Sequence, residues 1–240
     1  MSYIYKQNIL NLDLYETPLT TSTNDDLVRM YDNQDIILCA QEQKNGKGRR
    51  GNVWQSSNGN LYFSYSQCFA INDLSRMVCL IGLSLAQTIK KISPQSHVNI
   101  KWPNDVFLEQ KKVSGILIEN IRDDIWCIGI GVNIKSFPFL DNASYQATSL
   151  KENNINIDRI EFLKEYIKVF FHNLNEYKKQ GFSTIKEDWL SLALNYKKNI
   201  TIKIENTLKT GLFLTLDDDG YLVLENNGIK ERIIVGDLFI

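Results

Sequence analysis

The chain is organised around the segment Lys44-Asn45-Gly46-Lys47-Gly48-Arg49-Arg50-Gly51. It follows a strand-like run at 36–40 and precedes another at 61–66, with a polar, turn-rich segment in between. Its glycines have the G-x-G-x-x-G spacing of dinucleotide-binding folds, but that fingerprint requires a helix directly after the glycines. No helix pattern follows here, and the glycine and hydroxyl residues of a P-loop are also missing. Both of these nucleotide-binding folds are therefore excluded.

The same stretch, which we call the basic loop, is suited to an anion. Four of the seven residues from Lys44 to Arg50 are cationic and none is acidic, although the 240-residue chain has a formal charge of -1. Glycines let backbone amides approach a ligand and form an anion-binding concavity. Arginine forks match phosphate oxygens, and the nearby indole of Trp54 offers a flat face to a base. We therefore expect a nucleotide phosphate; a solvated basic surface loop is the alternative.

Composition places the chain among ordinary globular proteins. Hydrophobic residues make up 43% and charged residues 23% of 240 residues, enough for one large core or one domain with a small appendage. The near-neutral charge gives no overall reason to expect nucleic acid or an anionic membrane as partner. No apolar run has membrane-spanning length, and the N-terminus lacks a signal-peptide pattern. We predict a cytoplasmic protein.

Cysteine and histidine usage argues against several kinds of site. The cysteines are widely spaced without a C-x-x-C pair, so we expect reduced thiols in the core. His97 and His172 are isolated and far apart, so neither a zinc site nor a Ser-His-Asp nucleophile can be assembled. The four cysteines are Cys39, Cys68, Cys79 and Cys127.

Helical and strand patterns alternate along most of the chain. Hydroxyl and amide side chains at Ser22, Thr23 and Asn24 are interpreted as caps of a helix over 25–31. Apolar spacing predicts a largely buried helix over 74–92, and a capping-box pattern predicts another between Asp158 and Gly181. Short connections favour antiparallel hairpins, with Lys112 in a turn at 109–112. The expected strands are 36–40, 61–66, 99–102, 106–108, 116–118 and 126–134.

The sequence pattern changes beyond Asn195, from long helical and strand segments to short strand-like runs. Brief β runs separated by Asp-Gly and Asn-Gly turns predict a small barrel too small to hold a large active site. The expected domains are therefore 1–194, carrying the chemistry, and 195–240. The predicted strands of the barrel are 200–204, 212–216, 221–224 and 229–235.

A second polar constellation is Lys101-Trp102-Pro103-Asn104-Asp105, which joins two strand-like runs. An ordinary turn after proline would explain it equally well, and a lone lysine such as Lys112 is usually exposed to solvent. Together with the basic loop, however, these stretches closely resemble biotin protein ligases. The ordered segments that carry the resemblance are 22–24, 46–51 with Trp54, 61–64, 101–105, 112–119 and 129–133.

The resemblance implies an α+β fold. Its ligase domain would be similar to class II aminoacyl-tRNA synthetases, with a mixed, largely antiparallel sheet flanked by helices, and a small SH3-like β-barrel would follow at the C-terminus. The resemblance also implies the reaction. Biotin and ATP, with Mg²⁺ bound through substrate phosphates rather than a dedicated protein site, give biotinyl-adenylate and pyrophosphate. The biotinyl group then passes to a lysine of the biotin carboxyl carrier domain of acetyl-CoA carboxylase or a related carboxylase. A monomer or homodimer is expected.

Roles for individual residues follow from the same resemblance. Lys112 and Arg49 would be catalytic through the carboxylate and phosphate oxygens, and Asp105 would orient or deprotonate the acceptor lysine. The basic loop would order over the adenylate and exclude water. The implied biotin-binding residues are Ser22, Thr23, Asn24, Gln43, Gly46, Lys47, Arg49, Lys112, Gly115, Gly129 and Gly131. The implied ATP-binding or adenylate-binding residues are Lys47, Gly48, Arg49, Arg50, Gly51, Trp54, Asn104, Lys112 and Asn133.

The chain departs from the family pattern at three places. Lys47 stands where arginine is usual, and an ammonium cannot make bidentate contacts. Asn52 stands where many relatives have a basic residue, so retention of the adenylate is expected to be weaker. Ser22 comes too early for a preceding winged helix-turn-helix, so a ligase without DNA binding is expected. The alternatives are a lipoate or octanoate ligase and a non-catalytic protein that binds biotin or a nucleotide.

Overall fold

The computed structural model describes residues 3–139, 145–234 and 236–239. The chain divides into two compact units, which are described separately below. The first comprises Met1–Ile71, Lys112–Phe139 and Ala147–Lys168, and the second comprises Asn72–Lys111, Leu140–Gln146 and Val169–Ile240.

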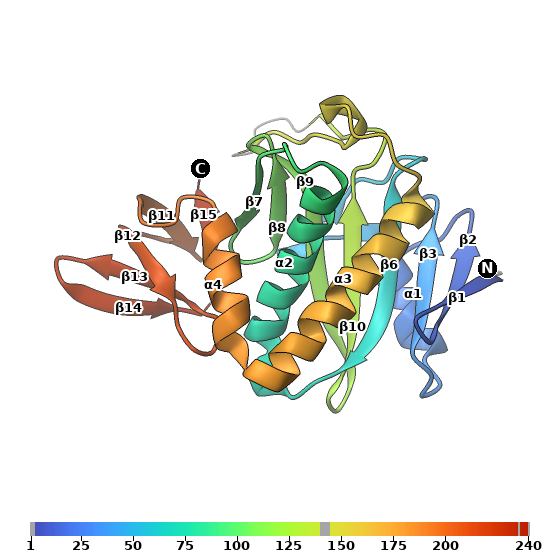
Figure 1. The fold of residues 1–240 in the computed structure, drawn as a ribbon, viewed down its shortest axis with the longest axis horizontal. Coiled ribbons are helices and arrows are strands. Elements are labelled where there is room, and N and C mark those ends of the chain that lie inside the picture. The colour runs from blue at the N-terminus through green and yellow to red at the C-terminus, as the bar shows by residue number, and fades with distance from the viewer. Residues whose placement is uncertain (1–2, 140–144, 235, 240) are drawn as a thin grey trace. The chain divides into compact units, whose positions relative to one another are not determined.

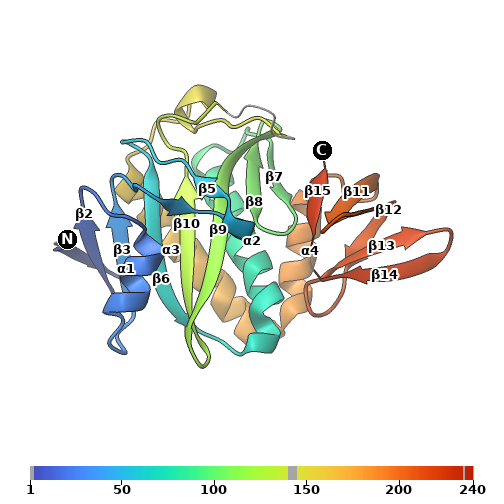
Figure 2. The same ribbon diagram turned by 180° about the vertical axis from the view of Figure 1, so that it is seen from behind.

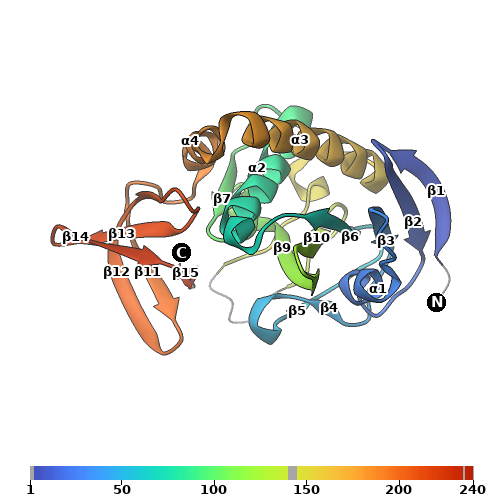
Figure 3. The ribbon, with the colours of Figure 1, turned by 90° about the horizontal axis from the view of Figure 1, so that it is seen from below.

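The first unit is built on a mixed, mostly antiparallel sheet in the order β1-β2-β3-β6-β10-β9. Only the β2–β3 pair is parallel within this order. Helix α1 and the β4–β5 ribbon lie on one face, and the first part of α3 lies on the other (Figures 2 and 3). The elements are β1 (Ile4–Ile9), β2 (Leu12–Thr17), α1 (Thr23–Met30), β3 (Ile36–Ala40), β4 (Gly46–Lys47), η1 (Arg49–Gly51), β5 (Val53–Trp54), β6 (Leu61–Cys68), β9 (Lys111–Arg122), β10 (Ile125–Val132), η3 (Lys151–Asn153) and α3 (Arg159–Gln180).

Strand β6 shows why the two faces of this sheet differ. Successive side chains of a strand point to opposite faces. Phe63 and Tyr65 pack against Tyr166 of α3, with the Tyr65 and Tyr166 hydroxyls 2.7 Å apart. Ser64, between them in sequence, hydrogen-bonds instead to α1 on the opposite face. The apolar face thus anchors the helix, and the polar face is left for the site.

The second unit contains a β7–β8 hairpin, α2 and α4, which pack together, and a five-stranded antiparallel sheet (Figure 1). That sheet has the order β14-β13-β12-β11-β15 and is consistent with an SH3-like module. Val235, the end of a predicted strand, and the terminal Ile240 lie outside the described residues. The elements are η2 (Ile71–Asp73), α2 (Leu74–Ile92), β7 (Val98–Lys101), β8 (Asp105–Leu108), α4 (Phe182–Leu192), β11 (Asn199–Ile204), β12 (Thr207–Leu216), β13 (Leu222–Asn226), β14 (Ile229–Ile233) and β15 (Asp237–Phe239).

Polar contacts hold the turn between β12 and β13 against α2. Ser75 donates to the Gly220 carbonyl at 3.0 Å, and Arg76 donates to the Asp218 carbonyl at 2.8 Å. Arg76 also forms an ion pair with Asp219 at 2.5 Å. This turn therefore serves as a contact between the small sheet and a helix of the same unit.

Several sequence predictions are confirmed and several are wrong. The α+β class and helices 74–92 and 158–181 are confirmed to within a residue or two. The N-terminal segment is a β-hairpin rather than a lead-in, and α4 was not predicted. Lys112 lies on β9 rather than in a turn, because the connection is completed by Glu109 and Gln110, both with positive φ. The boundary at 194/195 stays a prediction.

No helix among the described residues has the length and apolar character needed to cross a membrane.

The burial of the cysteines gives a testable difference in reactivity. Cys39, Cys79 and Cys127 are buried and Cys68 is exposed, and all four are free thiols. Burial raises the pKa of the Cys39 thiol to about 12, and also raises the pKa of Cys79 and Cys127, so little thiolate forms. Ellman's reagent at pH 8 should therefore titrate one thiol in the folded protein and four in guanidinium. Cys68→Ser should abolish the native reaction; rapid labelling of a second cysteine would contradict this assignment.

Candidate functional site

A polar cluster on the open face of the first unit joins α1 to β6. Ser64 Oγ lies 2.7 Å from Thr23 Oγ1 and 2.6 Å from Asn24 Oδ1, and all three residues are buried. Gln43 Oε1 accepts hydrogen bonds from the Thr23 amide at 2.8 Å and the Thr23 hydroxyl at 3.1 Å. Thr23, Asn24 and Gln43 are therefore brought together as predicted, and Ser64 is an additional member.

The capping interpretation holds for one residue of the three. Ser22 is the N-cap of α1, and its side chain accepts from the Asp25 amide at 3.4 Å. Thr23 and Asn24 already belong to the helix, and their side chains point into the polar cluster instead. Because the helix begins at Thr23, two residues earlier than predicted, its first turn presents these side chains to the sheet.

Glycines on β10 let neighbouring segments lie directly on the sheet. A Cβ at Gly129 would lie 2.0 Å from Asn24 Oδ1, and a Cβ at Gly131 would lie 2.5 Å from Trp54 Cε2. Real Cβ atoms do not approach so closely, so both positions require glycine. Gly131 pairs across the ladder with Gly115 on β9, which removes a third Cβ from the same area. We call these three residues the glycine floor.

Trp54 lies over the glycine floor and brings Lys112 beside it. Trp54 reaches this place because β5 pairs with β4, with Gly46 opposite Trp54. A Cβ at Gly46 would lie 2.5 Å from the Trp54 carbonyl oxygen, so this close pairing also depends on glycine. Lys112 Nζ lies 5.3 Å from the centroid of the indole ring. The flat ring and the ammonium, predicted from distant stretches, are thus neighbours.

The basic loop folds into a compact turn between β4 and β5. The Gly48 amide donates to the Asn52 carbonyl at 2.7 Å, which closes the segment containing η1. Arg50 has φ 55° and Gly51 has φ 76°, a left-handed backbone that glycine adopts without strain. Arg49 is half-buried, whereas Arg50 is exposed. The two arginines of the loop therefore have different surroundings.

Lys47, at the start of this loop, is held by two carboxylates. Its Nζ forms an ion pair with Asp25 of α1 and lies 3.4 Å from Glu119 Oε1 of β9. The hydrogen bond to Asp25 is the main cause that raises the pKa of Lys47. Glu119 Oε2 also accepts from Asn24 Nδ2 at 2.7 Å. The sequence prediction did not include Asp25 or Glu119, which lie far apart in the chain; the only available signal was charge opposite to that of the loop.

Asn133, just beyond β10, carries a buried acceptor. Its Nδ2 donates to the Thr148 carbonyl at 2.9 Å and its amide donates to the Val113 carbonyl at 2.9 Å. Its Oδ1 is buried and has no hydrogen-bond partner among the described residues, and the same is true of Trp54 Nε1. Leaving such atoms unpaired costs about 1–3 kcal/mol each, so a ligand that pairs with them would be favoured.

Two predicted residues lie in the second unit. Asp105 is the first residue of β8, is 9% exposed and stands opposite Lys101 in the hairpin. Lys101 Nζ lies 4.9 Å from the ring centroid of Tyr145 and 5.9 Å from that of Phe107. Asn104 precedes this strand. That Asn104 and Asp105 act beside Lys112 stays a prediction.

The residues of the site include no ready set of metal ligands. Across the described parts of the chain, no group of three or more His, Cys, Asp or Glu side chains gathers as a metal centre would. Asp25 and Glu119, which lie beside the start of the basic loop, are engaged by Lys47. That Mg²⁺ enters through substrate phosphates stays a prediction.

The contact between Trp54 and the glycine floor can be tested directly. Gly131→Ala should lift the indole from β10, because the new Cβ would overlap the ring at 2.5 Å. We expect the free energy of unfolding to fall by about 1–3 kcal/mol, as for other overpacked sites. Urea denaturation measures this loss, and red-shifted tryptophan emission reports the exposed ring.

A double-mutant cycle with Trp54→Ala supplies the control. If the indole is what the added methyl meets, Gly131→Ala should cost less in the Trp54→Ala background than in the native one. Equal losses in both backgrounds would show that the cost arises elsewhere.

Comparison with known proteins adds independent evidence. A sequence model described as the Biotin/lipoate A/B protein ligase family matches residues 15–134, half of the chain. The bifunctional ligase/repressor BirA of Bacillus subtilis is 30% identical over 223 residues, covering 88% of this chain and 68% of that protein. The biotin--[acetyl-CoA-carboxylase] ligase of Paracoccus denitrificans is 29% identical over 238 residues, covering 92% and 97% respectively. That this chain does not bind DNA stays a prediction.

A solved structure resembles most of the chain. The biotin protein ligase from Aquifex aeolicus in complex with biotin and ATP is 28% identical and has a TM-score of 0.83, covering 94% of this chain and 97% of that one. Sequence family, full-length relatives and fold therefore agree. The chain is a member of the biotin/lipoate A/B protein ligase family.

Proposed function

We propose that this chain is a biotin protein ligase, which activates biotin with ATP and transfers it to a lysine of a carboxylase carrier domain. The observation that carries the proposal is the grouping of Trp54, Lys112 and the basic loop over the glycine floor. Family membership supports it, as do relatives named for biotin ligation. The relation to a structure that holds biotin and ATP supports both substrates.

In the first step a biotin carboxylate oxygen attacks the α-phosphorus of ATP and pyrophosphate leaves. Negative charge is crowded on the phosphate and carboxylate oxygens, and preorganised cations stabilise it without reorganising. Lys112 and Arg49 would supply such charge, together with the amide of Gly51. Mg²⁺ bound to the phosphates would add to this neutralisation.

The polar cluster is suited to the ureido ring of biotin. Thr23 is held by Gln43, and Ser64 joins Thr23 to Asn24, before any ligand arrives, which lowers the ordering cost of binding. Trp54 would stack on adenine, whose amino group could donate to Asn133 Oδ1, the buried acceptor without a partner among the described residues. The ureido ring is thus assigned to the polar cluster, and the adenine to Trp54 and Asn133.

In the second step the acceptor lysine attacks the carbonyl carbon of the mixed anhydride, AMP leaves, and the amine loses a proton. An ammonium cannot attack, so a base is required, and Asp105 is the proposed group. Closure of the basic loop would keep water from hydrolysing the anhydride.

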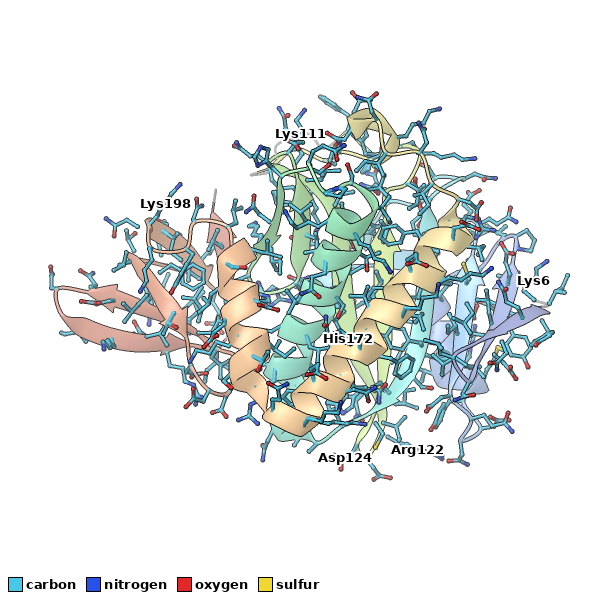
Figure 4. All side chains as sticks on the ribbon, viewed as in Figure 1. Lys6, Lys111, Arg122, Asp124, His172 and Lys198 are labelled. Carbon is cyan, nitrogen blue, oxygen red and sulfur yellow. The ribbon has the colours of Figure 1, made fainter. Side chains whose placement is uncertain are left out.

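The central test compares two adjacent lysines. With ATP, Mg²⁺, labelled biotin and a carrier domain, Lys112→Ala should lower the rate of carrier labelling by at least about a hundredfold, the order expected for a lost charge-stabilising group. Lys111→Ala is the matched control, because Lys111 is the preceding, exposed residue of β9 (Figure 4). Intact labelling in Lys112→Ala would remove the catalytic assignment.

The same assay separates the related activity. The family description also includes lipoate, so lipoate is the competitor to test. Excess lipoate should leave biotin-dependent pyrophosphate release unchanged. Preferential use of lipoate would make the chain a lipoate ligase, and ligand binding without pyrophosphate release would make it a binding protein.

A further inference from the structure

Lys47 bridges three elements of the first unit. It lies on β4, and the carboxylates that hold it come from the first turn of α1 and from β9. The side chains of Lys47 and Asp25 are each 40% exposed, and that of Glu119 is 33% exposed. We call Asp25, Lys47 and Glu119 the acidic clasp.

The acidic clasp fixes the first limb of the basic loop. Lys47 immediately precedes Gly48, whose amide closes the turn containing Arg49 and Arg50. On the other limb, Lys47 pairs with Val53 in the β4–β5 ribbon. Holding the Lys47 ammonium therefore sets where the whole turn begins.

The clasp is also continuous with the polar cluster. Glu119 accepts from Asn24 Nδ2 through one oxygen while it faces Lys47 with the other. Asn24 Oδ1 in turn accepts a hydrogen bond from the Ser64 hydroxyl at 2.6 Å, and the Asn24 side chain lies against Gly129. A single carboxylate thus links the loop to the residues proposed to hold the ureido ring.

These contacts pair the Lys47 ammonium with carboxylates of the protein itself, which favours a structural role for Lys47 over phosphate binding. An ammonium serves as a point charge between two carboxylates, whereas a guanidinium is shaped for planar, bidentate acceptors. Asp25 and Glu119 are therefore placed to receive an ammonium at this position.

We propose that Asp25 and Glu119 are positioning residues that seat the basic loop through Lys47, and that they thereby retain the biotinyl-adenylate until the acceptor arrives. The proposal rests on the proposed ligase function. In this proposal the arginines of the loop contact the phosphate, and Lys47 anchors the loop to Asp25 and Glu119.

Two interpretations of Lys47 differ in the sign of the expected effect. If the acids seat the loop, neutralising them loosens it and the adenylate escapes faster. If the acids merely compete with a phosphate for Lys47, neutralising them frees the ammonium and the adenylate is held longer.

The experiment measures the lifetime of enzyme-bound adenylate. The full chain is loaded with labelled biotin, ATP and Mg²⁺ in the presence of pyrophosphatase, freed of small molecules, and followed for release of label. In Asp25→Asn/Glu119→Gln, release should be about three- to tenfold faster than in wild type, as expected for two partly exposed ion pairs. Asp25→Glu, which keeps the charge, should restore most of the lifetime when compared with Asp25→Asn.

Salt provides a readout that a purely structural role would not give. Raising NaCl to 0.5 M should speed release by a larger factor in wild type than in the double variant. Salt screens the contacts between the loop arginines and the phosphate in both proteins, but only wild type also has the ion pairs of Lys47 to lose. Asp124→Asn is the matched control, because it removes one charge from the β9–β10 hairpin. Asp124 is exposed, and its side chain forms no hydrogen bond or ion pair with the described residues (Figure 4). The release rate of this variant should equal that of wild type.

The outcomes separate this inference from the function on which it rests. Equal or longer adenylate lifetimes in the double variant would overturn the inference and leave the ligase assignment standing. Failure of wild type to form any adenylate would overturn both.

Discussion

The site depends on the absence of side chains at three positions of the central strands. Gly129 and Gly131 on β10, with Gly115 opposite Gly131, form the glycine floor. Any larger residue at the first two would overlap Asn24 or Trp54, at 2.0 and 2.5 Å from the new Cβ. A strand loses stability when it carries glycine, because glycine adds entropy to the unfolded chain and packs no side chain. Strand β10 is nevertheless paired on both sides, with β6 and with β9, from Ile125 to Val132.

The packing of α1 and β5 on the glycine floor also determines which charged side chains lie beside the basic loop. The first turn of α1 brings Asp25 toward β4, and β9 brings Glu119 to the same place. The basic loop, which would repel itself in isolation, thereby gains two carboxylates at one end. Arg49 and Arg50 lie in the next turn, where the left-handed backbone of Arg50 and Gly51 reverses the chain. The net effect is a loop anchored at Lys47 and positively charged beyond it.

Sequence reasoning identified the features whose signal is local. The helix over 74–92 repeats apolar residues at helical spacing, so its bounds were predicted almost exactly. Ser22 was identified as a cap from its side-chain chemistry. Helix α4 escaped because its N-cap is Gly181, which makes no side-chain capping bond. Strand β1 escaped because most of its residues are exposed and carry no buried face.

The features that were missed in the site depend on contacts between distant residues. Asp25 and Lys47 are separated by 22 positions and Lys47 and Glu119 by 72, so no local pattern links them. Lys112 was placed in a turn because two lysines follow a polar dipeptide, whereas Glu109 and Gln110 alone supply the positive φ angles. The resemblance to a family suggested roles for residues such as Lys112, but it could not supply the two carboxylates that hold Lys47.

The two ends of the site differ in whether their buried polar groups are hydrogen-bonded. Thr23, Asn24, Gln43 and Ser64 bond to one another and so need little rearrangement when a ligand arrives. Asn133 Oδ1 and Trp54 Nε1 are buried without partners among the described residues, which is an energetic cost in the folded chain. That cost is removed when a ligand supplies the missing donor and acceptor, so binding energy is concentrated at the end of the site where the nucleotide is proposed to lie. The two parts of the site therefore differ in what a ligand would gain there: preorganised partners at the polar cluster, and relief of unpaired buried atoms at Asn133 and Trp54.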